Sequence, residues 1–186
     1  MRPTTRTLVT AILLAGALTL AACSEPFPET PNSIGEGYPS GGIPVSVAWP
    51  SDWLDGFAGE PGTVGGSIMG LRLDYVEDRW MWRVRSVDPG RDILGESVTE
   101  PDRGRESLFD ARTLALVKDR SVTLSDAERA PVVESCYDAA QLSGEVYPSP
   151  RLVGIERQTE HGRPVWKITT YDTETGDQST VIVDAS

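Results

Sequence analysis

Two stretches of the chain, residues 82–88 and 166–172, alternate apolar and polar side chains in nearly the same way, and each begins with a tryptophan. A period of two is typical of a β-strand that buries one face. We therefore expect Trp82 and Trp166 to anchor the core. The arginines that alternate with Trp82 are expected to face water.

Each stretch leads into a turn-rich segment and then into a second apolar strand that ends in Asp-Ala, at Asp110 and at Asp184. The chain is therefore predicted to contain two copies of one small unit. We expect both aspartates to end their strands by accepting backbone N–H groups in the following turn. The alternative is that the two carboxylates act together in acid/base chemistry or bind Ca²⁺.

The predicted fold class is α+β, with two small antiparallel-sheet units in tandem at residues 49–121 and 122–186. The first unit is expected to have strands at residues 71–75, 80–85, 107–109 and 113–117 and a charged turn at residues 118–120. It is expected to lack a leading helix, because residues 52–66 are rich in Gly and Pro. The second unit is expected to begin with a helix that has Pro131 near its first position and Gly144 after its end. Three antiparallel strands should follow, at residues 152–158, 165–171 and 180–183.

Residues 1–22 have the features of an export signal. Arg2 and Arg6 precede an uncharged apolar run at residues 8–20, which is too short to span a hydrocarbon layer of about 30 Å. The sequence Leu20-Ala21-Ala22-Cys23 then resembles the bacterial lipobox. The resemblance implies cleavage before Cys23 and a diacylglycerol on its sulfur, and the alternative is a free thiol after an ordinary cleavage site. Several acyl chains would hold the protein on the outer face of a membrane.

Residues 24–44 are rich in Pro, Gly, Ser and Glu. We therefore expect residues 23–48 to be the lipidated cysteine and a flexible tether. The full chain has a formal charge of −11, and without residues 1–22 it keeps 15 basic and 28 acidic residues, a charge of −13. This charge excludes nucleic acid as a partner and favours membrane attachment by lipid rather than by a basic patch.

Few residues are suited to catalysis. His161 is the only histidine, which excludes most metal sites and a Ser/His/Asp triad with its base elsewhere. It lies in a predicted hairpin turn and is expected to be solvated or to contact a partner. Cys136 lies on an apolar helical face and is expected to be a buried thiol. The five tryptophans are expected to fill the core rather than line a ligand groove. We expect the protein to have no enzymatic activity and to bind neither a cofactor nor a metal ion.

The order helix, strand, turn, strand, turn, strand in the second unit resembles the PepSY domain. The matching residues are 153–156, 165–168 and 181–185. The first unit resembles the same domain in a degenerate form, since Leu114 stands where the family has Gly. The resemblance implies an extracytoplasmic α+β module that binds other proteins, is proposed to restrain peptidases, and has no catalytic residues.

The function expected from these features is that of a membrane-anchored extracytoplasmic lipoprotein that binds or regulates another protein, such as a peptidase or a sensor. The candidate contact surface is formed by Tyr147, Pro148 and Pro150 beside an open sheet edge, together with His161. The alternative is a structural envelope lipoprotein, or one that holds a small ligand between its two units.

Overall fold

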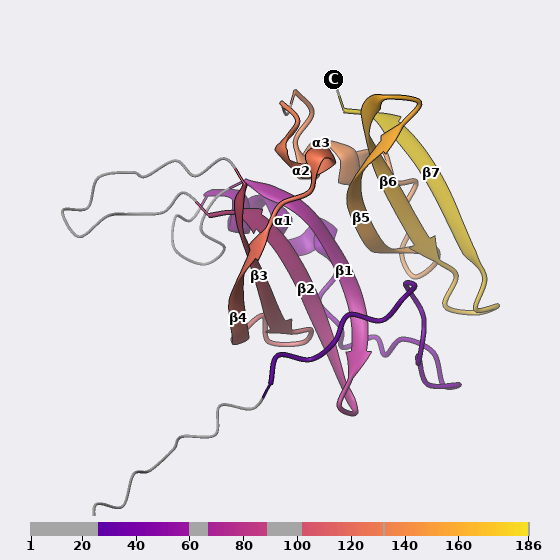
Figure 1. Ribbon diagram of the computed structural model, residues 1–186. Helices are drawn as coiled ribbons and strands as arrows, with labels where there is room; N and C mark the ends of the chain where they lie inside the picture. Colours follow the sequence, from indigo (N-terminus) through magenta and orange to yellow (C-terminus); the bar gives the residue numbers. More distant parts are fainter. Residues whose placement is uncertain (1–25, 60–66, 89–101, 132, 186) are drawn as a thin grey trace, which may run out of the picture.

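The computed structural model describes residues 26–59, 67–88, 102–131 and 133–185. Seven strands form one antiparallel sheet in the order β4-β3-β2-β1-β5-β6-β7 (Figure 1). The strands are β1 (Ile68–Val76), β2 (Arg79–Val87), β3 (Arg103–Asp110), β4 (Leu116–Thr123), β5 (Arg151–Glu160), β6 (Arg163–Tyr171) and β7 (Gln178–Asp184). The helices are α1 (Pro50–Gly59), α2 (Asp126–Arg129) and α3 (Cys136–Gln141).

The prediction of two tandem PepSY-like units is wrong, because the strands of both halves belong to one continuous sheet. The halves join where β1 and β5 pair antiparallel through only three residue pairs, from Gly70–Glu156 to Arg72–Gly154. Gly70 permits the close approach of the two strands, since a Cβ there would lie 3.2 Å from the carbonyl oxygen of Ile155. The join is therefore short but unbroken.

The two repeated tryptophans occupy equivalent places on either side of this join. Both are fully buried. Trp82 Nε1 donates to the carbonyl oxygen of Ala48 at 2.7 Å, and Trp166 Nε1 donates to that of Glu134 at 2.9 Å. In each half the acceptor lies two residues before a helix, so the tryptophan fixes the chain that leads into α1 or α3 against the sheet.

The helices differ from the predicted ones. An unpredicted helix, α1, precedes the first half. In the second half the expected helix starting near Pro131 is replaced by α2 and α3, which are short. Capping boxes at Ser125 and Ser135 begin them. Pro131 falls between the two helices because it lacks an N–H and holds the preceding residue in an extended conformation.

The charged turn predicted at residues 118–120 is instead part of β4. Each of these residues pairs with β3, and the register places Arg120 opposite Glu106 and Lys118 opposite Leu108. Because β4 is an edge strand, its charged side chains can be tolerated on both faces and can oppose addition of another strand.

The two faces of the sheet are covered differently (Figure 1). Residues 26–34 cross the face that carries Arg83, where Ile34 packs next to Gly154. The chain then passes to the opposite face, on which Ile43 and Val47 join the apolar core under α1 and α3. Residues 26–48, for which the composition predicts a tether, therefore lie against the sheet, and we call residues 26–34 the strap.

Candidate ligand cavity between the two halves of the sheet

A cavity of about 250 Å³ lies where β1 and β5 part. Residues 69–72 of β1 and residues 156–158 of β5 form its walls, Ser125 and Glu128 close one side from the start of α2, and Thr30 of the strap also lines it. The cavity exists because β1 and β5 stop pairing at Gly70 and Glu156. The lining is largely ionic, with seven charged side chains: Arg72, Arg83, Arg85, Arg157, Glu106, Glu128 and Glu156.

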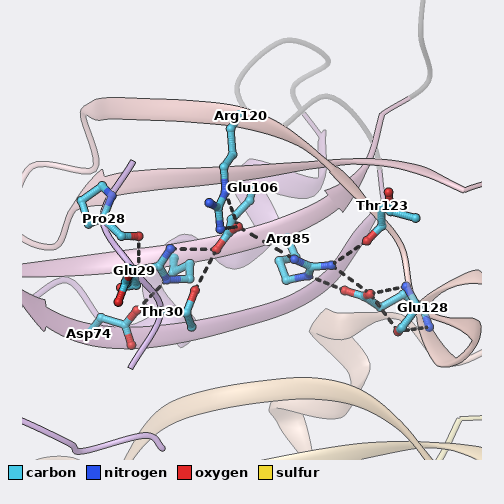
Figure 2. A network of polar contacts seen from close by, with 11 residues as sticks. Pro28, Glu29, Thr30, Asp74, Arg85, Glu106, Arg120, Thr123 and Glu128 are labelled. Atoms are coloured by element: carbon cyan, nitrogen blue, oxygen red, sulfur yellow. Dashed lines mark hydrogen bonds and ion pairs between the residues drawn. The ribbon is translucent and has the colours of Figure 1, made fainter. Parts of the chain in front are cut away.

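The alternation predicted that the arginine face of β2 meets water, and at Arg83 this prediction is wrong. Only 1% of Arg83 is exposed. Its Nε donates to Asp74 at 2.7 Å and its Nη1 donates to Glu106 at 2.7 Å. Its Nη2 donates to the carbonyl oxygen of Glu29 at 3.2 Å, so the strap covers this guanidinium (Figure 2). Paired in this way, the buried charge is a fixed part of the fold.

Glu106 is the centre of this ion-pair network (Figure 2). Besides Arg83, its carboxylate accepts from Arg120 Nε at 2.8 Å and Nη2 at 2.6 Å. Burial raises the pKa of the Glu106 carboxyl, but the hydrogen bonds from Arg120 and Arg83 outweigh burial and hold the pKa below its ordinary value. Glu106 is therefore an anion committed to the two arginines.

A second ion pair links the sheet to α2. Arg85 Nε donates to Glu128 Oε1 at 2.5 Å and its Nη2 donates to Oε2 at 3.1 Å, which is a bidentate pair. Glu128 also accepts the backbone N–H of Ser125 at 2.8 Å. Burial raises the pKa of Glu128, and these hydrogen bonds lower it further than burial raises it.

We expect the protein to lose stability in acid because of Glu106 and Glu128. Both have a lowered pKa in the folded state. Their contribution to the free energy of unfolding is thus complete above the ordinary glutamate pKa of about 4.3. It is lost as the pH falls through the lower pKa values of the folded state. Urea unfolding between pH 7 and pH 3 measures the effect. Glu128→Gln should flatten the acid limb of the curve, and an unchanged free energy of unfolding down to pH 3 would contradict the assignment.

Two arginines in the cavity wall have a nitrogen for which the described residues offer no hydrogen-bond partner: Arg72 Nη2 and Arg157 Nη1. Arg72 Nε donates to Asp74 at 2.7 Å, whereas its Nη1 lies 3.9 Å from Glu156. Arg157 Nη2 donates to the carbonyl oxygen of Pro131 at 3.0 Å. Burial lowers the pKa of the Arg157 guanidinium. Two buried arginines that line the cavity therefore keep unused donors.

The sequence did not single out Arg72 or Arg157. A usable signal was present, because β1 and β2 carry arginines and an aspartate on the same face and β3 carries Glu106 opposite Arg85. Charges of both signs that match across a predicted register favour a buried ionic face. The pattern does not indicate which arginine donor remains without an acceptor.

The predicted contact residues do not meet at one place. Tyr147 is 74% exposed and lies before β5, which is paired on both sides, so the residues from Tyr147 to Pro150 lead into an interior strand. The open edges of the sheet are β4 and β7. His161 is exposed in the turn between β5 and β6, with a positive φ of 50°.

The two repeated aspartates cannot act as a pair, because β3 and β7 are five strand positions apart in the sheet. Asp110 Oδ1 accepts the N–H groups of Arg112 at 3.1 Å and Thr113 at 2.9 Å, and the Thr113 bond in particular lowers the pKa of Asp110. Asp184 ends β7. In the ranges that the structure describes, no cluster of His, Cys, Asp and Glu is suited to a metal ion.

Of the two cysteines, the structure describes Cys136. Cys136 is buried and unpaired, and burial raises the pKa of its thiol, which keeps it protonated and unreactive. Cys23, the predicted lipidation site, lies outside the described residues. Among the residues described, no helix is both long and apolar enough to cross a membrane.

Comparisons with known proteins do not identify a family for this chain. No protein-family model and no curated protein matches the chain. One solved structure that resembles it is described as a "putative lipoprotein" from Clostridium difficile 630. The two chains are 12% identical, the match covers 71% of this chain and 91% of the other, and the TM-score is 0.33. At that score the similarity establishes neither a shared fold nor a shared function.

Proposed function

We propose that this protein is a lipid-anchored extracytoplasmic binding protein whose cavity, at the join between the two halves of the sheet, takes a small polar ligand. The observation that carries the proposal is the cavity itself, which opens between β1 and β5 and is lined by charged side chains. Ligand sites commonly lie between two structural halves and place a few polar groups at fixed positions. The ion pairs that hold Arg83 and Arg85 supply that fixed surrounding.

Binding is favoured over catalysis by the state of the lining residues. Ser125 Oγ already donates to Glu128 as part of the helix cap, and Glu106 is held by two arginines. A nucleophile needs an adjacent base that is free to take its proton. No histidine lines the cavity, and the carboxylate next to Ser125, that of Glu128, is held by Arg85.

The lipobox-like sequence supports attachment to the membrane through Cys23, and the strap supports a short connection. Lys118 Nζ donates to the carbonyl oxygen of Pro26 at 2.9 Å, so Pro26 is already held at β4. Three residues of extended chain reach at most about 11 Å. The sheet would therefore lie next to the bilayer surface rather than at the end of a long tether.

The anchor is tested by Cys23→Ala. We expect this variant to remain unprocessed or to leave the membrane fraction, because it lacks the sulfur that would carry the diacylglycerol. The measurement is fractionation into aqueous and detergent phases, with Ser24→Ala as the matched control next to the cleavage site. Equal partitioning of Cys23→Ala and the unsubstituted protein would contradict lipidation.

The cavity is tested by filling it. Gln158 lines the cavity and is exposed, so Gln158→Trp should occupy the space without disturbing the core. We would measure the melting temperature of the full chain in non-ionic detergent with a panel of sugars, amino acids and dicarboxylates. At least one compound should raise the melting temperature of the unsubstituted protein and of Gln141→Trp, the matched control on α3, but not that of Gln158→Trp. A panel without effect, or equal effects on all three proteins, would contradict the proposal.

A second candidate is binding of an extracytoplasmic protein, such as a peptidase or a sensor, at the open edge of β7. Val181 and Ile182 are 42% and 43% exposed on this edge strand. A partner could add a strand there. In that case Ile182→Lys would abolish retention of a purified peptidase or sensor ectodomain on the immobilised full chain, whereas the exposed Thr180→Lys would weaken it less. Equal retention by both variants would contradict this role.

A further inference from the structure

Two buried arginine nitrogens in the cavity wall lack a hydrogen-bond acceptor. Arg72 and Arg157 are 9% and 5% exposed, and the Nη2 of the first and the Nη1 of the second have no partner in the described part of the chain. A buried donor without an acceptor costs about 1–3 kcal/mol, and more when the group is charged. A bound acceptor would remove this cost.

The carboxylates of the cavity wall are not available to these donors. Glu106 is engaged by Arg83 and Arg120. Glu128 is engaged by Arg85. The nearest remaining carboxylate oxygen, on Glu156, lies 3.9 Å from Arg72 Nη1, which is beyond a hydrogen bond. The cavity-wall donors that are left without an acceptor are therefore Nη2 of Arg72 and Nη1 of Arg157.

Both guanidinium groups are held in place by bonds that do not involve a ligand. Asp74 fixes Arg72 through Nε at 2.7 Å. Arg157 lies 4.8 Å from the centre of the Trp166 ring and donates to the carbonyl oxygen of Pro131. Groups that are already ordered lose little conformational freedom when they bind a ligand. The planar fork of arginine is matched to a carboxylate or a phosphate.

We propose that the cavity binds a small ligand through an anionic oxygen group, a carboxylate or a phosphate, which accepts hydrogen bonds from Arg72 and Arg157. This inference rests on the proposed function, because it specifies the chemistry of the ligand in the same cavity. The volume of about 250 Å³ limits the ligand to a small molecule or to the headgroup of a larger one. A free anion and a phospholipid headgroup offer the same chemistry, and the position next to the bilayer makes both accessible.

The test is calorimetric titration of the full chain in non-ionic detergent with succinate, with inorganic phosphate and with dihexanoyl phosphatidylglycerol. Succinamide, which has the shape of succinate without its charge, is the control ligand. We expect at least one anion to bind and succinamide not to bind. A free-anion ligand would give binding of succinate or phosphate, whereas a headgroup ligand would give binding of the phospholipid alone.

The residues are tested with Arg72→Met and Arg157→Met, which keep an apolar stem and remove the charge. Each should weaken binding of the anion at least tenfold, while Arg112→Met, at an exposed position, should leave it unchanged. Binding of succinamide as tight as that of succinate would overturn the inference even if a variant failed to fold. If a neutral compound binds and Gln158→Trp blocks it while no anion binds, the cavity function stands and the anionic class is wrong.

Discussion

Glu106→Gln is expected to lower the free energy of unfolding by about 3–5 kcal/mol, the range typical of removing one partner from a buried ion pair. The carboxylate is 2% exposed and is the shared acceptor of Arg83 and Arg120. Without its charge, Arg83 remains buried with only part of its compensation. Urea denaturation followed by tryptophan fluorescence measures the loss, and Glu160→Gln at an exposed position is the matched control.

The double variant Glu106→Gln with Arg83→Met separates the cost of an unpaired charge from the loss of packing. It should recover part of the stability, because a well-packed apolar group can replace a buried ion pair at little cost. If Glu106→Gln costs less than about 1 kcal/mol, the value usual for a surface ion pair, the network is not the buried support described above.

Trp166→Ala and Trp82→Ala are each expected to cost about 3–5 kcal/mol, as large-to-small substitutions in a packed core do. Both side chains are fully buried, and each also gives up a hydrogen bond to the chain before a helix. Trp→Phe at either position should cost less, because it keeps most of the ring and removes only the hydrogen bond of the indole N–H. At Trp82 the carbonyl oxygen of Ala48 would still accept from Trp53 Nε1 at 3.2 Å. Thermal unfolding followed by circular dichroism measures these effects.

The same experiment tests whether the halves unfold together. Because both belong to one sheet, each variant should unfold in a single transition at a lower temperature. Two separate transitions, with Trp166→Ala shifting only one of them, would show that β1 and β5 do not couple the halves in solution.

Much of the fold could be predicted from the alternation of side chains. The period of two around Trp82 and Trp166 identified β2 and β6, whereas the repeat predicted two separate units and the structure has one sheet. The join between the halves could not be predicted, because three residue pairs at Gly70 and Gly154 carry no periodic pattern. A resemblance to a family describes the local order of helix and strands, and that order is compatible with separate units or with one sheet.

The charged face was misjudged for a related reason. Alternation shows that Arg83 lies opposite Trp82, but whether that face meets water depends on what covers it. The cover is the strap, a segment whose Pro-rich composition predicts a tether. Its contacts are made largely by backbone carbonyl groups, such as that of Glu29 on Arg83, and any residue can supply these. The cavity could not be predicted for the same reason, because its position depends on how β5 and the strap are placed next to Arg72.

The most direct test of the central claim, that the join between β1 and β5 is a binding site, is hydrogen–deuterium exchange of the full chain with and without succinate or inorganic phosphate. We predict slower exchange at the backbone amides of residues 69–72 and 156–158, and no change along β7. Unchanged exchange at these residues with every anion, together with protection of residues 178–184 by an added peptidase or sensor ectodomain, would contradict the claim and place the function at the β7 edge.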